Sequence, residues 1–167
     1  MSNSNTNGGV GPLETGRVSI SFPCSAEYVS IARLAILGVA SRLSLSYDEV
    51  EDVRLAVGEA CTHAVERASA NGYKAPTNGG RGTITIIADV SQSELQIEVA
   101  DDVPTGGAGS DVVDEEFADL DIDRQGLGEL LMEILVDEVE VKTEPNGTSI
   151  RLVKRAPEAS TSSVPAN

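Results

Sequence analysis

Two segments of alternating apolar and polar residues, at 83–90 and 94–101, constrain the fold of this chain more than any other feature. They read TITIIADV and ELQIEVAD. Because successive side chains of a strand point to opposite faces, each segment has one apolar face that must be covered. Only Ser91, Gln92 and Ser93 separate the two segments, which predicts an antiparallel hairpin.

Two segments with helical spacing of apolar residues can supply that cover. The first follows Ser25, a candidate N-cap, and extends to about Leu43. The second opens on Ser46 with Glu49 three residues later, which is the pattern of a capping box, and is predicted to run to Asn71–Gly72.

The remaining elements complete an α+β fold. The segment RVSISFP (17–23) is predicted as a half-buried strand, GLGELLMEILVDEVEV (126–141) as a glycine-led helix that runs into a strand, and NGTSIRLVKR (146–155) as a turn and a last strand. The predicted fold class is a two-layer α+β sandwich, with helices packed on one face of a mixed, mostly antiparallel sheet. Because 40% of the residues are hydrophobic but only 3% are aromatic, the core is expected to be aliphatic.

The length of 167 residues predicts one domain, which we place at residues 17–155. The flanking segments 1–16 and 156–167 are polar and are expected to be disordered tails. Within the domain, residues 102–125 lose periodicity and become acidic. A segment of this length inside a compact domain is usually a lid, a binding loop or disordered.

Charge excludes several classes of partner. With 12 Lys and Arg against 27 Asp and Glu, the net charge is −15, so nucleic acid and anionic membranes would repel the chain. A protein with a basic or mixed surface is the expected partner. No apolar run approaches the ~20 residues of a membrane span, and the polar N-terminus lacks a signal-peptide pattern. With Cys24 and Cys61 expected as buried thiols, the chain is predicted to be a cytoplasmic protein.

One candidate site lies in the helix RLAVGEACTHAVERA (54–68), where Glu59 and His63 stand four residues apart. Side chains at this spacing share one face of a helix, so the two groups suit a general base, a shared metal ion or an ordinary surface pair. His63 is the single histidine of the chain, which excludes a zinc site of the usual composition. The pattern alone leaves three interpretations open: a general base, a shared metal ion other than zinc, and an ordinary surface pair.

Two further signals are ambiguous when taken singly. Gly126, Leu127 and Gly128 open a predicted helix, and glycines there let backbone amides approach a phosphate, although the same pattern is common in ordinary turns. Asp101 ends a predicted strand, where it suits either an acceptor for the exocyclic amine of a base or a solvated turn residue. Asp102 beside it suggests a metal site, but no other ligand cluster accompanies the pair.

Taken together, these signals follow one another in an order and at a spacing that is more specific than any one of them. The blocks YDEVEDVRLAVGEACTHAV, EVAD, GLGELLMEILVDEVEV and NGTSIRLVKR resemble the bacterial anti-sigma-factor serine kinases of the GHKL (Bergerat-fold) ATPase superfamily, from about Val18 to Arg155. The resemblance implies a helix-covered sheet that holds ATP and Mg²⁺ beneath a lid. It implies an anti-sigma factor that binds a sigma factor, phosphorylates a serine of an anti-anti-sigma protein, and is a homodimer.

The resemblance also implies roles for individual residues. Glu59 matches the acid that activates the attacking hydroxyl, and Asp101 matches the acceptor of the adenine amine. The other matched positions serve the nucleotide: Gly126, Leu127 and Gly128 as the glycine box, Thr148 near the adenine, and 104–125 as the lid.

Two positions depart from the family's pattern. His63 stands where the family has an Asn that binds Mg²⁺, and Val103 stands where it usually has a glycine. Magnesium prefers oxygen ligands. A non-catalytic module of the same fold, which sequesters a sigma factor or its antagonist, is therefore the alternative. The seven acids between Asp111 and Asp123 suit either a solvated loop or a protein-docking surface.

Overall fold

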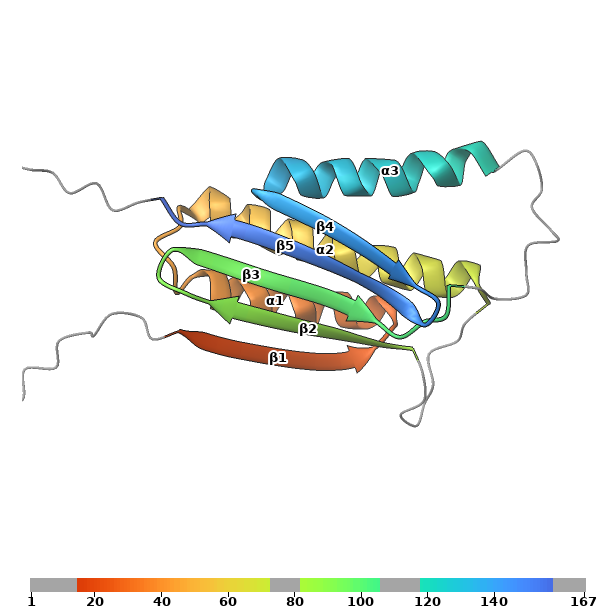
Figure 1. Ribbon diagram of the computed structural model, residues 1–167, viewed down its shortest axis with the longest axis horizontal. Helices are drawn as coiled ribbons and strands as arrows, with labels where there is room; N and C mark the ends of the chain where they lie inside the picture. The colour runs from red at the N-terminus through yellow and green to blue at the C-terminus, as the bar shows by residue number, and fades with distance from the viewer. Residues whose placement is uncertain (1–14, 73–81, 106–117, 158–167) are drawn as a thin grey trace, which may run out of the picture.

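The structure is a computed structural model that describes residues 15–72, 82–105 and 118–157, the side chains of 118–125 excepted. A five-stranded sheet and three α-helices make up this part of the chain (Figure 1). The helical elements are η1 Ala26–Tyr28, α1 Val29–Ala40, α2 Tyr47–Ala70 and α3 Ala118–Leu135. The strands are β1 Gly16–Pro23, β2 Thr83–Val90, β3 Glu94–Asp101, β4 Glu138–Glu144 and β5 Gly147–Arg155.

The strands lie in the order β1-β2-β3-β5-β4, and each neighbouring pair is antiparallel. The predicted hairpin is confirmed as β2 and β3, with the predicted bounds and with Ile86 opposite Val99. The described sheet is wholly antiparallel rather than mixed. The register also sets Asp101, at the end of β3, opposite Thr148 at the start of β5.

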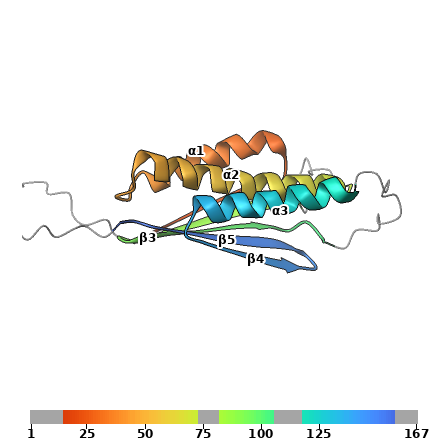
Figure 2. The same ribbon diagram turned by 90° about the horizontal axis from the view of Figure 1, so that it is seen from above.

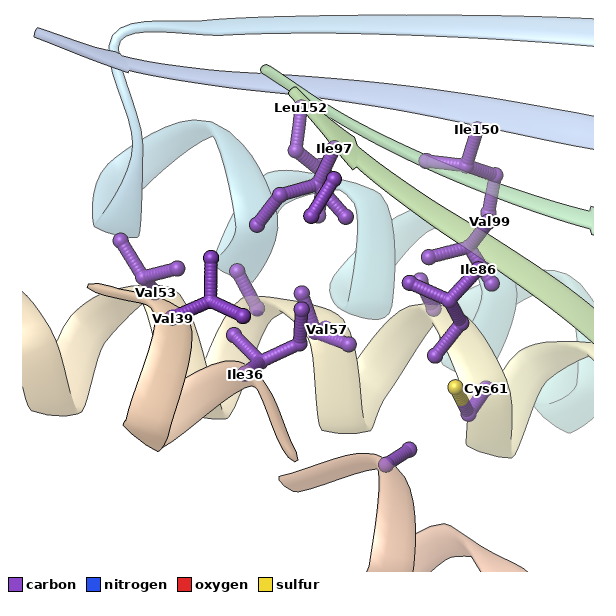
Figure 3. Packing of buried hydrophobic residues seen from close by; sticks show 14 of the residues in the cluster. Ile36, Val39, Val53, Val57, Cys61, Ile86, Ile97, Val99, Ile150 and Leu152 are labelled. Carbon is purple, nitrogen blue, oxygen red and sulfur yellow. The ribbon is translucent and has the colours of Figure 1, made fainter. Parts of the chain in front are cut away.

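The helices form a second layer on one face of the sheet, which confirms the predicted α+β sandwich (Figure 2). Helix α2 lies in the middle of this layer and contacts both α1 and α3. The core between the layers is aliphatic, as Figure 3 shows for side chains of α1, α2 and the strands. Its fully buried members include Ile36, Val57, Ile86, Ile97 and Leu152.

A capping box begins α2, as the sequence predicts. The Ser46 hydroxyl accepts a hydrogen bond from the backbone N–H of Glu49 at 3.3 Å, and the Glu49 carboxylate accepts one from the backbone N–H of Ser46 at 2.7 Å. Ser25 behaves differently. It precedes the short 3-10 turn η1, and its side chain makes no capping hydrogen bond.

Helix α3 begins at Ala118, eight residues before the start predicted at Gly126. The segment ADLDIDRQ was assigned to the loop because it is acidic and lacks apolar periodicity. Acidic residues near a helix N-terminus interact favourably with the helix dipole, so the same composition also suits the first turns of a helix. The rest of the predicted lid, from 106 to 117, lies outside the described residues, as do nearly all of both predicted tails.

Two smaller predictions concern the cysteines and the membrane. Cys24 and Cys61 are both free and buried, as expected. Burial raises the pKa of the Cys61 thiol to about 12. Among the residues that the structure describes, no helix combines the length and apolar character needed to cross a membrane.

Candidate functional site

The candidate site is built on one face of α2. Glu59, His63 and Arg67 follow one another at four-residue intervals, so they form a line along the helix. All three are partly buried, because this face lies under α3 and toward the ends of β3 and β5. The sequence prediction that Glu59 and His63 share a face is met, and Arg67 extends the line by one turn.

Asp101 ends β3 and Asp102 follows it, and their side chains lie on opposite sides of the chain. The Asp101 side chain is only 3% exposed, forms a salt bridge with the Arg67 guanidinium, and accepts a hydrogen bond from the Val103 backbone N–H at 3.0 Å. The Asp102 carboxylate accepts hydrogen bonds from the backbone N–H groups of Gly82 and Thr83, at 2.7 and 2.6 Å. Asp101 is therefore an inward-facing acid, whereas Asp102 fixes the start of β2.

The start of β5 lies beside Asp101. Gly147 has φ +155°, and a Cβ atom there would lie 1.9 Å from the Asp101 carbonyl oxygen, so only glycine fits. Thr148 follows, 5% exposed, and its hydroxyl oxygen is buried without a hydrogen-bond partner. The structure thus brings two of the predicted site residues, Asp101 and Thr148, into neighbouring positions.

The predicted glycine box is divided between two sides of α3. At Gly128, a Cβ atom would lie 2.9 Å from Oε1 of Glu59, so the missing side chain lets α3 approach the catalytic candidate. At Gly126 nothing lies within 4 Å, and Leu127 is 65% exposed. Because α3 begins at Ala118, these residues lie inside the helix, and the phosphate-binding argument from a helix N-terminus does not apply to them.

The surroundings of His63 lower the pKa of its side chain and so favour the neutral form. Burial, and next the nearby Arg67 charge, lower the pKa of its imidazole, against the weaker opposing influence of Glu66, Glu59 and Asp101. Its Nδ1 atom is buried without a hydrogen-bond partner. Within the described ranges, no group of three or more His, Cys, Asp or Glu side chains is placed to hold a metal ion.

Among the described residues, three buried polar atoms without a hydrogen-bond partner belong to residues near Asp101. They are His63 Nδ1, Arg67 Nε and Thr148 Oγ1. Buried donors and acceptors are nearly always paired, so their coincidence favours a polar ligand such as a nucleobase. The same residues suit Mg²⁺ less well, because a neutral imidazole nitrogen is a poor ligand for a cation that prefers oxygen.

Arg67 is the residue that the sequence analysis missed. Its partner Asp101 is 34 residues away, and neither helical periodicity nor turn composition reports on such a contact. A signal was nevertheless present, because Arg67 is four residues after His63 and eight after Glu59.

The open face of the sheet also carries a hollow, of about 360 Å³, over β3, β5 and β4. Several of its charged side chains pair with one another: Glu140 lies 3.2 Å from Lys142 and 3.9 Å from Arg151. Asp101 and Thr148 are among its lining residues, but most of the lining belongs to the face of the sheet opposite the helices, and Glu59 and His63 are not part of it. We therefore place the candidate site beneath α2 and α3 instead.

Comparisons with known proteins agree with this architecture. Residues 22–154 match the family described as the histidine kinase-like ATPase domain. The chain is 36% identical over 146 residues to the serine-protein kinase RsbW of Bacillus licheniformis, and 37% identical over 147 residues to that of Bacillus subtilis. Each alignment covers 82% of this chain and 84% of the relative.

Solved structures share the fold at low sequence identity. The RsbU and RsbW domains of a Mycobacterium tuberculosis protein align with a TM-score of 0.55 at 17% identity, covering 84% of this chain and 32% of that one. The SiaB–SiaC complex of Pseudomonas aeruginosa aligns with a TM-score of 0.53 at 18% identity, covering 81% of this chain and 88% of the other. These structures share the fold, and the sequence matches establish that the chain belongs to the histidine kinase-like ATPase domain family, among the relatives of the serine-protein kinase RsbW.

Proposed function

We propose that this protein is an anti-sigma factor that binds a sigma factor and uses ATP to phosphorylate a serine of an anti-anti-sigma protein. The observation that carries the proposal is the approach of Glu59 to Gly128, on the α2 face that leads to the buried Asp101. Its relatives are named serine-protein kinases, which fits a carboxylate in this position. The function places the protein in the cytoplasm, and a homodimer is the expected assembly.

In this proposal each residue has a separate task. The Glu59 carboxylate accepts the proton of the partner's serine hydroxyl as that oxygen attacks. ATP, when bound, supplies the phosphoryl group that is transferred. Asp101 and Thr148 would lie at the adenine end of the site, and Gly128 leaves room for the Glu59 carboxylate beneath α3. Gly126 and Leu127 are assigned to the lid side of the nucleotide.

The residues of the site suit Mg²⁺ less well than they suit a nucleobase. His63 occupies the position that the family's metal-binding Asn would take, and its partly buried imidazole, whose lowered pKa favours the neutral form, offers nitrogen rather than oxygen. This observation favours a second candidate function, in which the same fold sequesters a sigma factor or its antagonist without phosphorylating it.

Phosphotransfer measurements separate the two functions. The purified protein is incubated with radiolabelled ATP, Mg²⁺ and the proteins that it captures from its native cytoplasm. We expect label on a serine of a small partner, and we expect Glu59→Gln to abolish the labelling while ATP binding persists. Glu66→Gln is the matched control, because Glu66 is an exposed acid on the same helix. Absence of ATP binding at about 1 mM by calorimetry would contradict the kinase.

The variant His63→Asn tests the metal position directly. If the imidazole weakens Mg²⁺ binding, the Asn side chain, which supplies an oxygen, increases the Mg²⁺-dependent part of the ATP affinity. The affinity is measured with Mg²⁺ and with EDTA for both proteins. An unchanged Mg²⁺ dependence in the variant means that His63 does not limit the metal, and the second candidate function loses its support.

A further inference from the structure

The buried salt bridge between Arg67 and Asp101 bears on how the proposed site reads its nucleotide. The side chains of Arg67 and Asp101 are 14% and 3% exposed, so water reaches neither charge freely. Two opposite charges in such surroundings attract strongly, and removing one partner leaves a buried charge that needs another. The charge of Asp101 is therefore already balanced by Arg67 before any ligand binds.

The hydrogen bonds of the Asp101 carboxylate engage both of its oxygens. Oδ2 accepts from Arg67, and Oδ1 accepts from the backbone N–H of Val103 at 3.0 Å. Val103 itself is fully buried. An exocyclic amine that approached Asp101 would have to share a carboxylate whose charge Arg67 already balances and whose two oxygens each accept a hydrogen bond.

We propose that Arg67 is a specificity-determining residue, which holds Asp101 in an internal ion pair and thereby removes the 6-amine of the base as a determinant of nucleotide affinity. The inference rests on the proposed function, because it takes Asp101 as the acceptor at the base end of the ATP site. A purine nucleotide then binds through its phosphates and ring, and the protein does not distinguish adenine from a purine without the amine.

The test compares ATP with purine riboside triphosphate, which lacks only the 6-amine. Dissociation constants for both ligands are measured by calorimetry for the natural protein, Arg67→Met and Arg67→Gln. The natural protein is expected to bind the two within about twofold. Arg67→Met leaves Asp101 without its partner, so the amine becomes that partner, and ATP is expected to bind about tenfold to a hundredfold tighter than the analogue.

Two controls distinguish this effect from a purely structural role. Arg42→Met removes an exposed arginine at the end of α1 and should leave the ratio of the two constants unchanged. Adding Asp101→Ala to Arg67→Met should return the ratio to near one. A structural loss of packing weakens both ligands equally and does not change the ratio.

The natural protein alone already puts the inference at risk, whether or not the variants fold. If it binds ATP tenfold or more tightly than the analogue, Arg67 does not shield Asp101 and the inference is wrong. If it binds both ligands equally and a folded Arg67→Met still shows no preference, the inference fails while ATP use stands. If neither the natural protein nor a folded variant binds either triphosphate, the proposed ATP use fails as well.

Discussion

The contact between Gly128 and Glu59 depends on the absence of a single methyl group. Its Cβ position lies 2.9 Å from a carboxylate oxygen, closer than such atoms normally approach. Because that oxygen is at the end of a flexible side chain, a new methyl group would displace the carboxylate more readily than it would displace the helix. Gly128 thus fixes the position of Glu59 rather than the conformation of the backbone.

We expect Gly128→Ala to lower phosphotransfer roughly tenfold or more without loss of stability, because the Glu59 carboxylate moves away from the transferred proton. Alanine is the better helix residue by up to about 1 kcal/mol, so the melting temperature should stay constant or rise. Gly38→Ala is the matched control, since Gly38 lies in α1 outside the candidate site and nothing lies within 4 Å of its Cβ position. Full activity in Gly128→Ala would show that the contact does not position Glu59.

At the residue scale, sequence reasoning reached the contacts that lie within one helix. The spacing of Glu59 and His63 placed both on one face, because helical geometry relates residues four apart. The Arg67–Asp101 pair was out of reach, since it requires α2 and the end of β3 to meet. The roles assigned to Glu59, Asp101 and Thr148 remain predictions until the variants are measured.

At the scale of the elements, local chemistry decided which boundaries were predictable. Strands β2 and β3 were found with their bounds because apolar and polar residues alternate along most of each segment and only three residues separate the two. The start of α2 was found because the capping box is a pattern of two residues three apart. The start of α3 was missed by eight residues, because an acidic segment without apolar periodicity is typical of both a loop and a helix beginning.

Ser46→Ala tests the contribution of the capping box to α2. The change removes the hydroxyl that accepts from the Glu49 backbone N–H, and it should lower the free energy of unfolding by about 1 kcal/mol. Urea denaturation of the natural protein, Ser46→Ala and Ser44→Ala measures this, with exposed Ser44 in the preceding loop as the control. Equal losses in the free energy of unfolding of the two variants would show that the capping hydrogen bond makes no specific contribution to stability.

The capping box also has a pH dependence. Hydrogen bonds from the backbone and the side chain of Ser46 lower the pKa of the Glu49 carboxyl. Its contribution to stability is therefore present above the ordinary pKa of a glutamate and is lost as the pH falls through the lowered value. The free energy of unfolding of the natural protein and of Glu49→Gln is measured with urea at a series of pH values. The difference between the two free energies should shrink as the pH falls through that range. A difference that does not change with pH would assign the effect to packing.

At the scale of the whole molecule, the dominant quantity is the net charge of −15. Like charges repel one another in the compact state, and salt screens this repulsion over a Debye length of about 10 Å at 0.1 M. We expect the melting temperature of the nucleotide-free protein to rise by roughly 2–5 °C between about 10 mM and about 300 mM sodium chloride. A fall would show that attractive pairs such as Arg17–Asp89 outweigh the repulsion.

The sequence predicted the layers of the molecule better than the arrangement of its strands. Apolar faces on the helices and on the hairpin require a sandwich, whatever the strand order. The pairing of β3 with β5 joins segments about fifty residues apart, and no periodicity within either strand selects that partner. The adjacency of Asp101 and Thr148 could not be predicted for the same reason, because the two residues are neighbours only through that strand pairing.

Strand β5, the last element of the described chain, lies inside the sheet between β3 and β4 rather than at an edge. A ribosome releases the chain from its N-terminus, so β3 and β4 emerge before the strand that joins them exists. Until Gly147–Arg155 has emerged, β3 keeps an unpaired edge beside an incompletely covered apolar face. The nascent chain therefore completes this sheet only after β5 has emerged, and a messenger truncated upstream of β5 would yield an aggregation-prone fragment rather than a smaller working domain.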